Sequence, residues 1–400
     1  MALTHHTHSP DYGAQRRFAR LCVVSLCALL SACGGGGSGS SVTTAAAANV
    51  TPLAVTQALN LDFSALSNYA TPLLPAYYDV VVRATDNTPV GDPVTDKIAT
   101  LGRVLFYDKS LSVNNTVSCA SCHRQASGFD DPSRFSLGFS GAAFTTAHTM
   151  RLSNIRYFRP GTAFWDRRAV SIEAQASQPI QNAIEMGFDA AHGGMSTLLA
   201  KAQAIGYYPD LFTLAFGDSA VTEVRIQRAL AQFERAMVSA GSRWDTGYAT
   251  TYDPALPNKG LNVAVPGLTA EENRGRGLFV NGPGAGGVGC ASCHVPPTFA
   301  LSANSRSNGL DAGETTIFKS PSLKSVGLSH AFMHDGRFST LAQVVEHYSS
   351  GIQAGPARDN RLPVGGLNLT VTEKSDLVAF LNTLNDTAFL ADAKFATPFK

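Results

Sequence analysis

The pentapeptide Cys119-Ala120-Ser121-Cys122-His123 occurs a second time in this chain, as Cys290-Ala291-Ser292-Cys293-His294. Two thiols three positions apart can add to the two vinyl groups of one haem, and the histidine that follows can bind its iron. The repeat therefore predicts two covalently bound haem c groups. Cys119 and Cys122 would hold the first haem and Cys290 and Cys293 the second. His123 and His294 would be the proximal ligands of the two irons.

Two other uses of paired cysteines are the alternatives to haem. The two pairs could form a four-cysteine zinc site, and a thioredoxin-type dithiol uses one pair on a βαβ unit. Neither use requires His123 or His294 directly after the second cysteine, whereas haem attachment does. The complete repeat of the five residues therefore favours haem.

Length and composition suit a globular protein of two domains. The chain has 400 residues, 44% of them hydrophobic, and a formal net charge of +1. This is enough apolar material for a real core in each domain. The balanced charge gives no reason to expect a nucleic acid as a partner.

Residues 1–33 carry the pattern of an export signal. Basic residues precede an apolar run over 21–30, which is too short to span a membrane as a mature helix. The residues LSAC at 30–33 resemble the bacterial lipoprotein cleavage box, which implies that Cys33 becomes the lipidated first residue. A plain cleaved signal is the alternative. Gly34, rather than an aspartate, favours anchoring at the outer membrane, facing the periplasm.

The cysteine count agrees with export. Of the seven cysteines, two leave with the signal, Cys33 takes the lipid and four take haem, so none remains for a disulfide. Haem c is attached in the periplasm, where spare thiols would be oxidised.

The rest of the chain is predicted to be mainly helical. Residues 34–50 are mostly Gly, Ser, Thr and Ala, which indicates a flexible tether. Beyond it, apolar residues recur every three to four positions over 94–107 and again over 221–238, the period of a helix with one buried face. Strand patterns are sparse. We therefore expect a mainly α fold.

A domain boundary is expected near residue 255. Residues 241–267 are rich in Gly, Pro, Asn and Thr, which predicts a loop, and residues 269–272 (TAEE) predict a capping box that opens a new helix. This gives an N-terminal haem c domain over 51–255 and a C-terminal haem c domain over 256–400. Each carries one CASCH followed by a long irregular segment.

With these motifs the chain resembles the bacterial dihaem cytochrome c peroxidases and their relative MauG, which oxidises residues of a partner protein. The resemblance runs from about Leu101 to Phe399 and implies two mainly helical cytochrome c domains, with the peroxide site at the first haem. Besides the two CASCH motifs, it rests on LGRVLFYD (101–108), FWDRRA (164–169), QASQPIQNAIEM (175–186), FKSPSL (318–323) and MHDG (333–336).

The resemblance implies roles for three residues. Glu185 and Gln175 match a glutamate and a glutamine that assist on the open face of the first haem, and Trp165 matches a tryptophan that carries electrons between the haems. One carboxylate can take a proton from the near oxygen of peroxide and deliver it to the leaving oxygen. The structural alternatives are a solvated Glu185, a Gln175 that packs a helix end, and a Trp165 buried for its area.

The residue opposite the first iron decides whether that iron is open. Classical members close it with a second histidine, and the resemblance places Phe139 at that position. Phenylalanine cannot bind iron, so an open sixth position is expected. His148, on the same stretch, is the alternative ligand. His148 also stands where classical members use an asparagine for calcium between the haems, so calcium is implied although imidazole is a poor ligand for it.

Four residues compete to lie opposite the second iron: Met333, His334, His347 and Tyr348. On a helix over 339–348 the apolar residues share a face with Tyr348, whereas His347 falls toward solvent. Tyr348 is therefore predicted to point inward. The resemblance agrees, because Tyr348 has the position of the axial methionine of classical members and the axial tyrosine of MauG. It implies packing for Met333, and contact with haem or its propionates for His334.

These expectations together describe a lipid-anchored dihaem peroxidase that faces the periplasm. It would reduce hydrogen peroxide at the first haem, with electrons supplied through the second by a small redox protein, a cytochrome c or a cupredoxin. One alternative is a MauG-like enzyme that uses peroxide to oxidise residues of a protein substrate. The other is a dihaem electron carrier without catalysis, which an open iron beside a carboxylate argues against.

Overall fold

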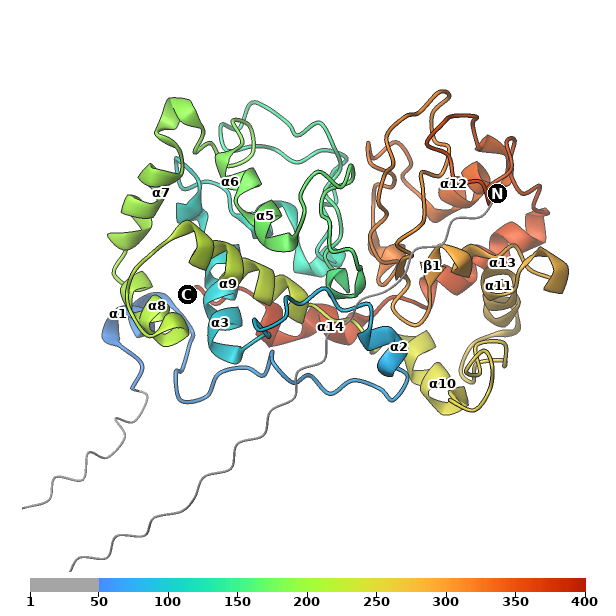
Figure 1. Ribbon diagram of the computed structural model, residues 1–400, viewed down its shortest axis with the longest axis horizontal. Helices are drawn as coiled ribbons and strands as arrows, with labels where there is room; N and C mark the ends of the chain where they lie inside the picture. Colours follow the sequence, from blue (N-terminus) through green and yellow to red (C-terminus); the bar gives the residue numbers. More distant parts are fainter. Residues whose placement is uncertain (1–49) are drawn as a thin grey trace, which may run out of the picture. The chain divides into compact units, whose positions relative to one another are not determined.

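The computed structural model describes residues 50–400. The predicted signal, the lipidated Cys33 and nearly all of the tether lie outside this range. Figure 1 shows a mainly helical protein with one small sheet, as expected. None of the described helices is long and apolar enough to cross a membrane.

The elements follow one another with long irregular segments after each CASCH. Strands β1 (His294–Val295) and β2 (Ala300–Leu301) pair antiparallel. The helices are α1 (Leu53–Ala58), α2 (Val80–Arg83), α3 (Asp96–Tyr107), α4 (Cys119–Cys122), α5 (Ile172–Ala176), α6 (Gln178–Gln181), α7 (Gly194–Gln203), α8 (Tyr208–Phe216), α9 (Glu223–Ala236), α10 (Arg243–Thr251), α11 (Ala270–Val280), α12 (Leu341–Glu346), α13 (Val371–Asn382) and α14 (Thr387–Ala391).

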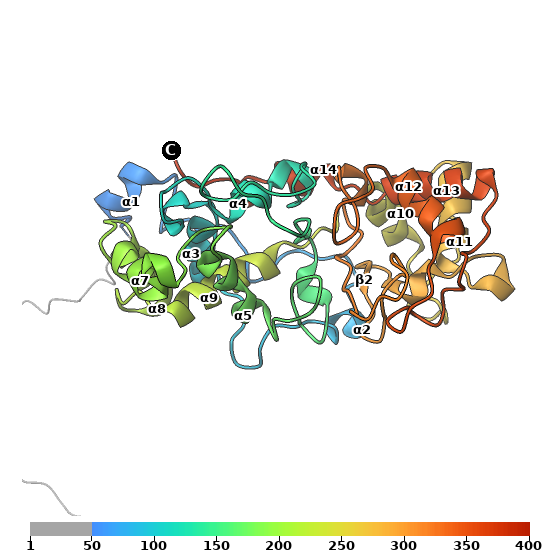
Figure 2. The ribbon, with the colours of Figure 1, turned by 90° about the horizontal axis from the view of Figure 1, so that it is seen from above.

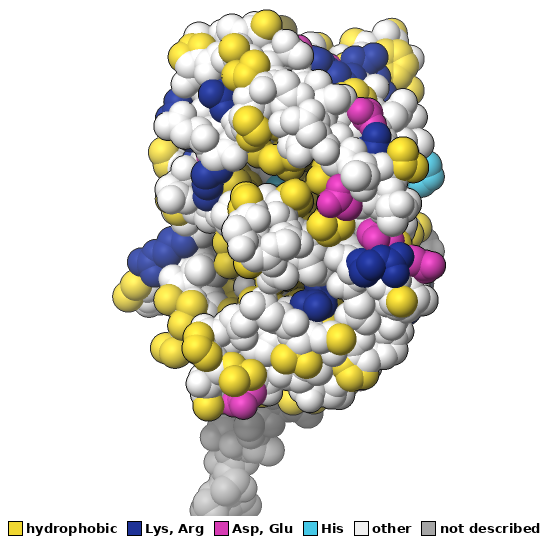
Figure 3. Space-filling model, turned by 90° about the vertical axis from the view of Figure 1, so that its right-hand side faces the viewer, with side chains coloured by type: hydrophobic (Ala, Val, Ile, Leu, Met, Phe, Trp, Pro, Cys, Tyr) yellow, Lys and Arg dark blue, Asp and Glu magenta, His cyan; other side chains and the backbone are white. Residues whose placement is uncertain are grey.

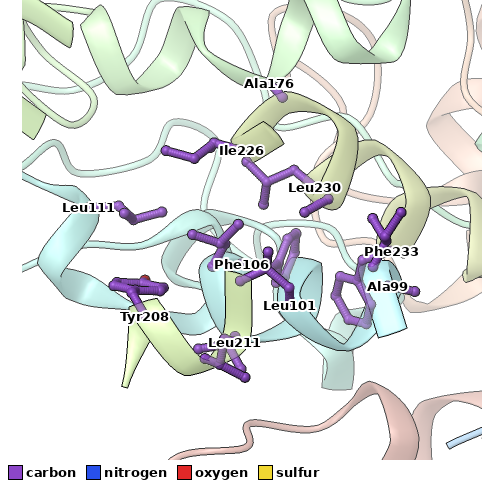
Figure 4. Close-up of a cluster of buried hydrophobic side chains, with 14 of the residues drawn as sticks. Ala99, Leu101, Phe106, Leu111, Ala176, Tyr208, Leu211, Ile226, Leu230 and Phe233 are labelled. Carbon is purple, nitrogen blue, oxygen red and sulfur yellow. The ribbon is translucent and has the colours of Figure 1, made fainter. Parts of the chain in front are cut away.

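One hydrophobic cluster is built around α3 and α9, the two helices that the apolar periodicity predicted. Figure 4 shows Leu101 and Phe106 of α3 facing Leu230 and Phe233 of α9. The helices touch at Gly102, where a Cβ atom would lie 1.9 Å from the Ala229 carbonyl oxygen. Only glycine therefore permits this close approach, which brings the apolar faces together.

A second hydrophobic cluster is built around α11 and α13, which lie side by side in Figure 2. Thr269 and Glu272 form the predicted capping box at the start of α11. Here the helices touch at Gly275, where a Cβ atom would lie 1.9 Å from the Asp376 carbonyl oxygen. The two clusters thus use the same kind of helix contact.

The ends of the described chain do not follow a simple division at residue 255. Tyr77 and Tyr78, near the start, are buried in the second cluster, and Phe389 and Phe395, near the end, are buried in the first. Each half is therefore completed by a segment from the far end of the sequence. The two haem domains and their boundary stay a prediction.

The loop predicted over 241–267 was wrong in part, because α10 lies within it. Ser242 and Asp245 form a capping box at the start of this helix, and Trp244 and Tyr248 are buried on one side of it. Gly and Thr weaken the helical pattern of the segment. Tertiary burial of the two large aromatic rings outweighs that weak propensity.

Candidate functional site

The first CASCH forms α4 and places His123 at the end of this helix. Ser121 Oγ accepts a hydrogen bond from the Ser118 backbone N–H at 2.9 Å, which holds the start of the turn. His123 Nδ1 lies 3.1 Å from the Phe129 carbonyl oxygen, so this nitrogen carries the proton and Nε2 keeps its lone pair for a metal. Desolvation lowers the pKa of His123, which favours the neutral ligand form.

The second CASCH is held differently. Cys290–Ser292 form a short 3-10 turn after Gly289, whose φ of 74° is available to glycine at little cost. His294 begins β1, and desolvation lowers its pKa to about 4. Its Nδ1 is buried and has no hydrogen-bond partner within residues 50–400. This imidazole is neutral, but no carbonyl group orients it.

A cavity of about 520 Å³ lies beside the second motif. Cys290, Cys293 and His294 line it together with Tyr348 and many apolar side chains. Lys319 is also on the wall, and it is buried with its Nζ donating to the Thr162 carbonyl oxygen. Burial lowers the pKa of Lys319 to about 7, and an anionic group beside it would favour its charged form. Thiols, an imidazole and this lysine around an apolar cavity fit a haem c with anionic propionates. Sequence patterns gave no sign of the role of Lys319.

Tyr348 lies on the cavity wall, as helical geometry predicted, and burial raises the pKa of its hydroxyl group. The expectation for His347 was wrong. Its side chain is buried, and its Nε2 lies 3.2 Å from the Asn308 carbonyl oxygen. The α-helical period ends at Glu346, because residues 347–351 form a π-helical turn that rotates the following side chains.

Met333 and His334 lie on a tight turn at the edge of the same cavity. Met333 has a φ of 73°, and its Sδ accepts from Asn308 Nδ2 at 3.3 Å. The His334 ring stacks on Phe318, with ring centroids 3.9 Å apart. Both residues line the cavity beside Tyr348. The packing predicted for Met333 and the haem contact predicted for His334 are compatible with these positions.

Glu185 lies on a turn after α6, close to the first motif. Burial raises the pKa of its carboxyl group, and the more distant Arg168 opposes this shift. Burial likewise raises the pKa of the Cys119 and Cys122 thiols, and the charge of Glu185 adds to both shifts. The half-buried carboxyl group therefore lies close enough to both cysteines for its charge to act on their thiols. Gln175 lies on α5, which precedes α6 and this turn in the sequence. Its side chain has no hydrogen bond to Glu185.

Phe139 is fixed against the Glu185 turn. Its backbone N–H lies 3.0 Å from the Glu185 carbonyl oxygen, and its own carbonyl oxygen accepts from Asn114 Nδ2 at 2.8 Å. Its ring covers Gly187, where a Cβ atom would lie 2.6 Å from the ring. The loop that bears Phe139 and the turn that bears Glu185 therefore form one packed unit.

Trp165 and His148 meet between the two motifs. The Trp165 indole Nε1 donates to the His148 carbonyl oxygen at 2.7 Å, and both residues line the cavity of the second motif. The His148 ring is buried, with Nδ1 3.0 Å from the Arg134 carbonyl oxygen and Nε2 2.9 Å from Asp130 Oδ1. Nδ1 is therefore engaged by a carbonyl oxygen, and Nε2 lies beside a carboxylate. Calcium near His148 stays a prediction.

Known proteins match this chain in both sequence and fold. A family model described as di-haem cytochrome c peroxidase matches residues 96–252. Methylamine utilization protein MauG of Methylorubrum extorquens is 32% identical over 314 residues, 74% of this chain and 80% of MauG. Cytochrome c551 peroxidase of Nitrosomonas europaea is 30% identical over 310 residues, 73% of this chain and 81% of that protein.

A solved structure agrees with the sequence comparisons. The crystal structure of a MauG-like protein associated with microbial copper homeostasis is 28% identical, has a TM-score of 0.64, and covers 83% of this chain and 99% of its own. The diheme peroxidase BthA from Burkholderia thailandensis, at 22% identity and a TM-score of 0.57, shares the fold. The chain belongs to the family of di-haem cytochrome c peroxidases and MauG.

Proposed function

We propose that this protein is a dihaem oxidoreductase that reduces hydrogen peroxide at the haem bound by His123 and receives electrons through the haem bound by His294. The observation that carries the proposal is the half-buried Glu185 carboxyl group, whose charge adds to the effect of burial in raising the pKa of the Cys119 and Cys122 thiols. A carboxyl group in this setting has little use in packing, because burying it costs free energy that the chain does not recover through an ion pair.

Glu185 is proposed as the acid-base residue. The haem, when bound, supplies the redox centre at which peroxide is reduced. The Glu185 carboxylate takes a proton from one peroxide oxygen and returns it to the other, so that the leaving oxygen departs as water. Because its pKa is raised, the carboxyl group holds the transferred proton more readily than an exposed glutamate does. Gln175 is proposed to assist by hydrogen bonding on the same face.

Phe139 is proposed to leave the sixth position of the first iron open. The side chain has no group that binds iron, and its loop is tied to the Glu185 turn through the backbone. Peroxide could then reach the iron without a prior reduction that releases a ligand. His148 is proposed not to take this position, since Asp130 and the Arg134 carbonyl oxygen engage both of its ring nitrogens.

A second candidate function is the peroxide-dependent oxidation of residues on a partner protein, as in MauG. Tyr348 on the cavity wall opposite the second motif favours it, because a tyrosine ligand stabilises oxidised iron better than a methionine does. Trp165, which lies on the same wall, would pass electrons between the haems in either function. A small redox protein would be the donor in the first function and a protein substrate the reductant in the second.

The partner and location remain proposals as well. The face shown in Figure 3 carries charged side chains of both signs scattered among apolar ones, which suits a transient protein partner better than a highly charged one. The export signal and Cys33 support a periplasmic protein anchored by lipid at the outer membrane.

The test of the proposed function is the substitution Glu185→Gln in the protein with both haems. It should leave both haems attached and slow the reaction with peroxide by about 10²–10⁴-fold, the usual contribution of acid-base catalysis. Stopped-flow absorbance of the haems measures this rate. The exposed Glu271→Gln at the start of α11 is the matched control and should react like the wild type. An unchanged rate in Glu185→Gln would remove the acid-base role.

A further inference from the structure

The surroundings of the His148 ring determine its protonation. The side chain is 4% exposed, and its two nitrogens face the Arg134 carbonyl oxygen at 3.0 Å and Asp130 Oδ1 at 2.9 Å. A carbonyl oxygen accepts hydrogen bonds and never donates them, and so does an ionised carboxylate. A neutral imidazole has one N–H, so one of its nitrogens would point a lone pair at an oxygen. Both nitrogens therefore carry protons.

Asp130 lies among hydrogen-bond donors. It is 1% exposed, and every other neighbour of its oxygens is a donor. The Asp131 backbone N–H donates to Oδ1 at 3.0 Å, Ser329 Oγ donates to Oδ2 at 2.5 Å, and Arg151 Nη1 lies 3.6 Å from Oδ2. A buried ion pair of this kind needs such donors around its carboxylate.

The backbone of His148 connects this ion pair to the residues between the motifs. Its N–H donates to the His334 carbonyl oxygen at 2.8 Å, and its carbonyl oxygen accepts from the Trp165 indole at 2.7 Å. Asp130 follows Phe129 directly, and the Phe129 carbonyl oxygen accepts from His123 Nδ1. One continuous network therefore runs from the proximal histidine of the first haem to Trp165 on the wall of the second cavity.

We propose that the protonated His148 ring positions Trp165 for electron transfer between the two haems. It acts through Trp165 and is not an iron ligand. The proposal rests on the proposed function, because it assigns a task to the electron path of that reaction. Removing the Nε2 proton would turn a lone pair toward Asp130 Oδ1. The ring would then move away, and the carbonyl oxygen that holds the Trp165 indole would move with it.

The charges that face the ring fix the direction of its titration. Burial lowers the pKa of His148, but the hydrogen bond and charge of Asp130 outweigh burial, and the pKa is raised despite the opposing charge of Arg151. Arg134 and His334 face the residue with backbone atoms. The imidazolium is therefore fully present below the ordinary pKa of histidine and is lost as the pH rises through the raised pKa of His148.

The experiment uses the oxidised protein with both haems and follows each haem by stopped-flow absorbance after stoichiometric peroxide, from pH ~6 to ~10. The absorbance change of the first haem tests the proposed function. The delay before the absorbance of the second haem changes tests the role of His148. In the wild type the second response should slow along a one-proton curve with a midpoint above about 6.5, the ordinary value for histidine. The slowing should reach up to about 100-fold, as for a misplacement of ~1 Å.

Two variants separate the charge from the shape of the side chain. His148→Asn is neutral and should respond slowly at every pH. His148→Lys keeps a cation beside Asp130 and should restore the fast response, with its midpoint moved to higher pH. The control is His192→Asn, which removes an exposed histidine 2.7 Å from Asp189 and should keep the wild-type profile. The proposal would be overturned if the second haem responded as fast in His148→Asn as in the wild type. It would also be overturned if His148→Lys were no faster than His148→Asn, or if the wild-type response did not slow as the pH rises.

A second readout does not need peroxide. In a Trp244→Phe background Trp165 is the one remaining tryptophan, and ultraviolet resonance Raman spectra report the hydrogen bond of its indole N–H. We expect that bond to weaken at alkaline pH and in His148→Asn, and to persist in His148→Lys. If the first haem does not react with peroxide but the indole spectrum changes with pH and substitution as expected, the proposed function fails and the positioning role stands. An indole signal that ignores both pH and substitution would contradict the positioning role.

Discussion

In the first hydrophobic cluster α3 packs on α9 through Gly102, and in the second α11 packs on α13 through Gly275. At each glycine an added Cβ atom would lie only 1.9 Å from a carbonyl oxygen of the facing helix. The scaffold that carries each CASCH is therefore the same. The surroundings of the two CASCH histidines differ, because a carbonyl oxygen orients His123 whereas Nδ1 of His294 has no hydrogen-bond partner among residues 50–400.

The two halves differ most in what accompanies each motif on its far side. The first has the Glu185 turn with Phe139 packed against it, and the second has the π-helical turn that bears Tyr348. In the proposed function the first side supplies a proton carrier and the second supplies an iron ligand. The difference lies in a few residues outside the paired helices.

The largest effect is expected from a substitution that supplies a sixth ligand to the first iron, because it would remove the difference between the two haem sites. Phe139→His puts a ligand on a loop that already packs against the Glu185 turn. We expect the oxidised protein to stop reacting with peroxide until it is partly reduced, and its first haem to become low-spin in EPR spectra. Phe144→His, at an exposed position on the same stretch, is the control. A Phe139→His protein that still reacts at once would show that this loop does not face the iron.

A change at the second motif should be confined to the second haem. Tyr348→Phe removes the hydroxyl group from the cavity wall, and we expect the optical spectrum of one haem to shift while the other keeps its spectrum. A redox titration should also show a change in the potential of that haem alone. If neither spectrum changes, the second iron has another ligand, and the difference between the halves lies elsewhere.

The shared scaffold predicts equal and smaller effects on stability. Gly102→Ala and Gly275→Ala each force a methyl group into a backbone oxygen, so each should lower the free energy of unfolding by about 3 kcal/mol, the upper part of the range for overpacking. Gly284→Ala has open space around it and should change stability little. Chemical denaturation monitored by circular dichroism measures all three. A large difference between the first two variants would mean that the helix contacts are not equivalent.

The sequence was sufficient for the features that depend on neighbouring residues. The CASCH spacing, the apolar period of α3 and α9, and the capping box of Thr269 are local, and the structure has each of them where the pattern predicts. The buried position of His347 was missed because a π-helical turn breaks the α-helical period without a sequence signal. The α-helical spacing of buried residues holds only where the backbone hydrogen bonds are α-helical.

Contacts between distant residues were beyond local patterns. His148 was predicted as an alternative iron ligand, but its partners Asp130 and Arg134 and the indole of Trp165 are brought to it by irregular loops. Lys319 enters the cavity wall in the same way. Periodicity carries no information about such loops, whose conformation depends on tertiary packing and on backbone angles at single residues, such as the positive φ of Phe164 and Met333.

The central claim is that the first iron is open and the second is closed. The most direct test records EPR and optical spectra of the fully oxidised protein and then adds stoichiometric peroxide without any reductant. We predict one high-spin haem that reacts at once, with a spectral change at both haems. Two low-spin haems that ignore peroxide until the protein is half reduced would contradict the claim.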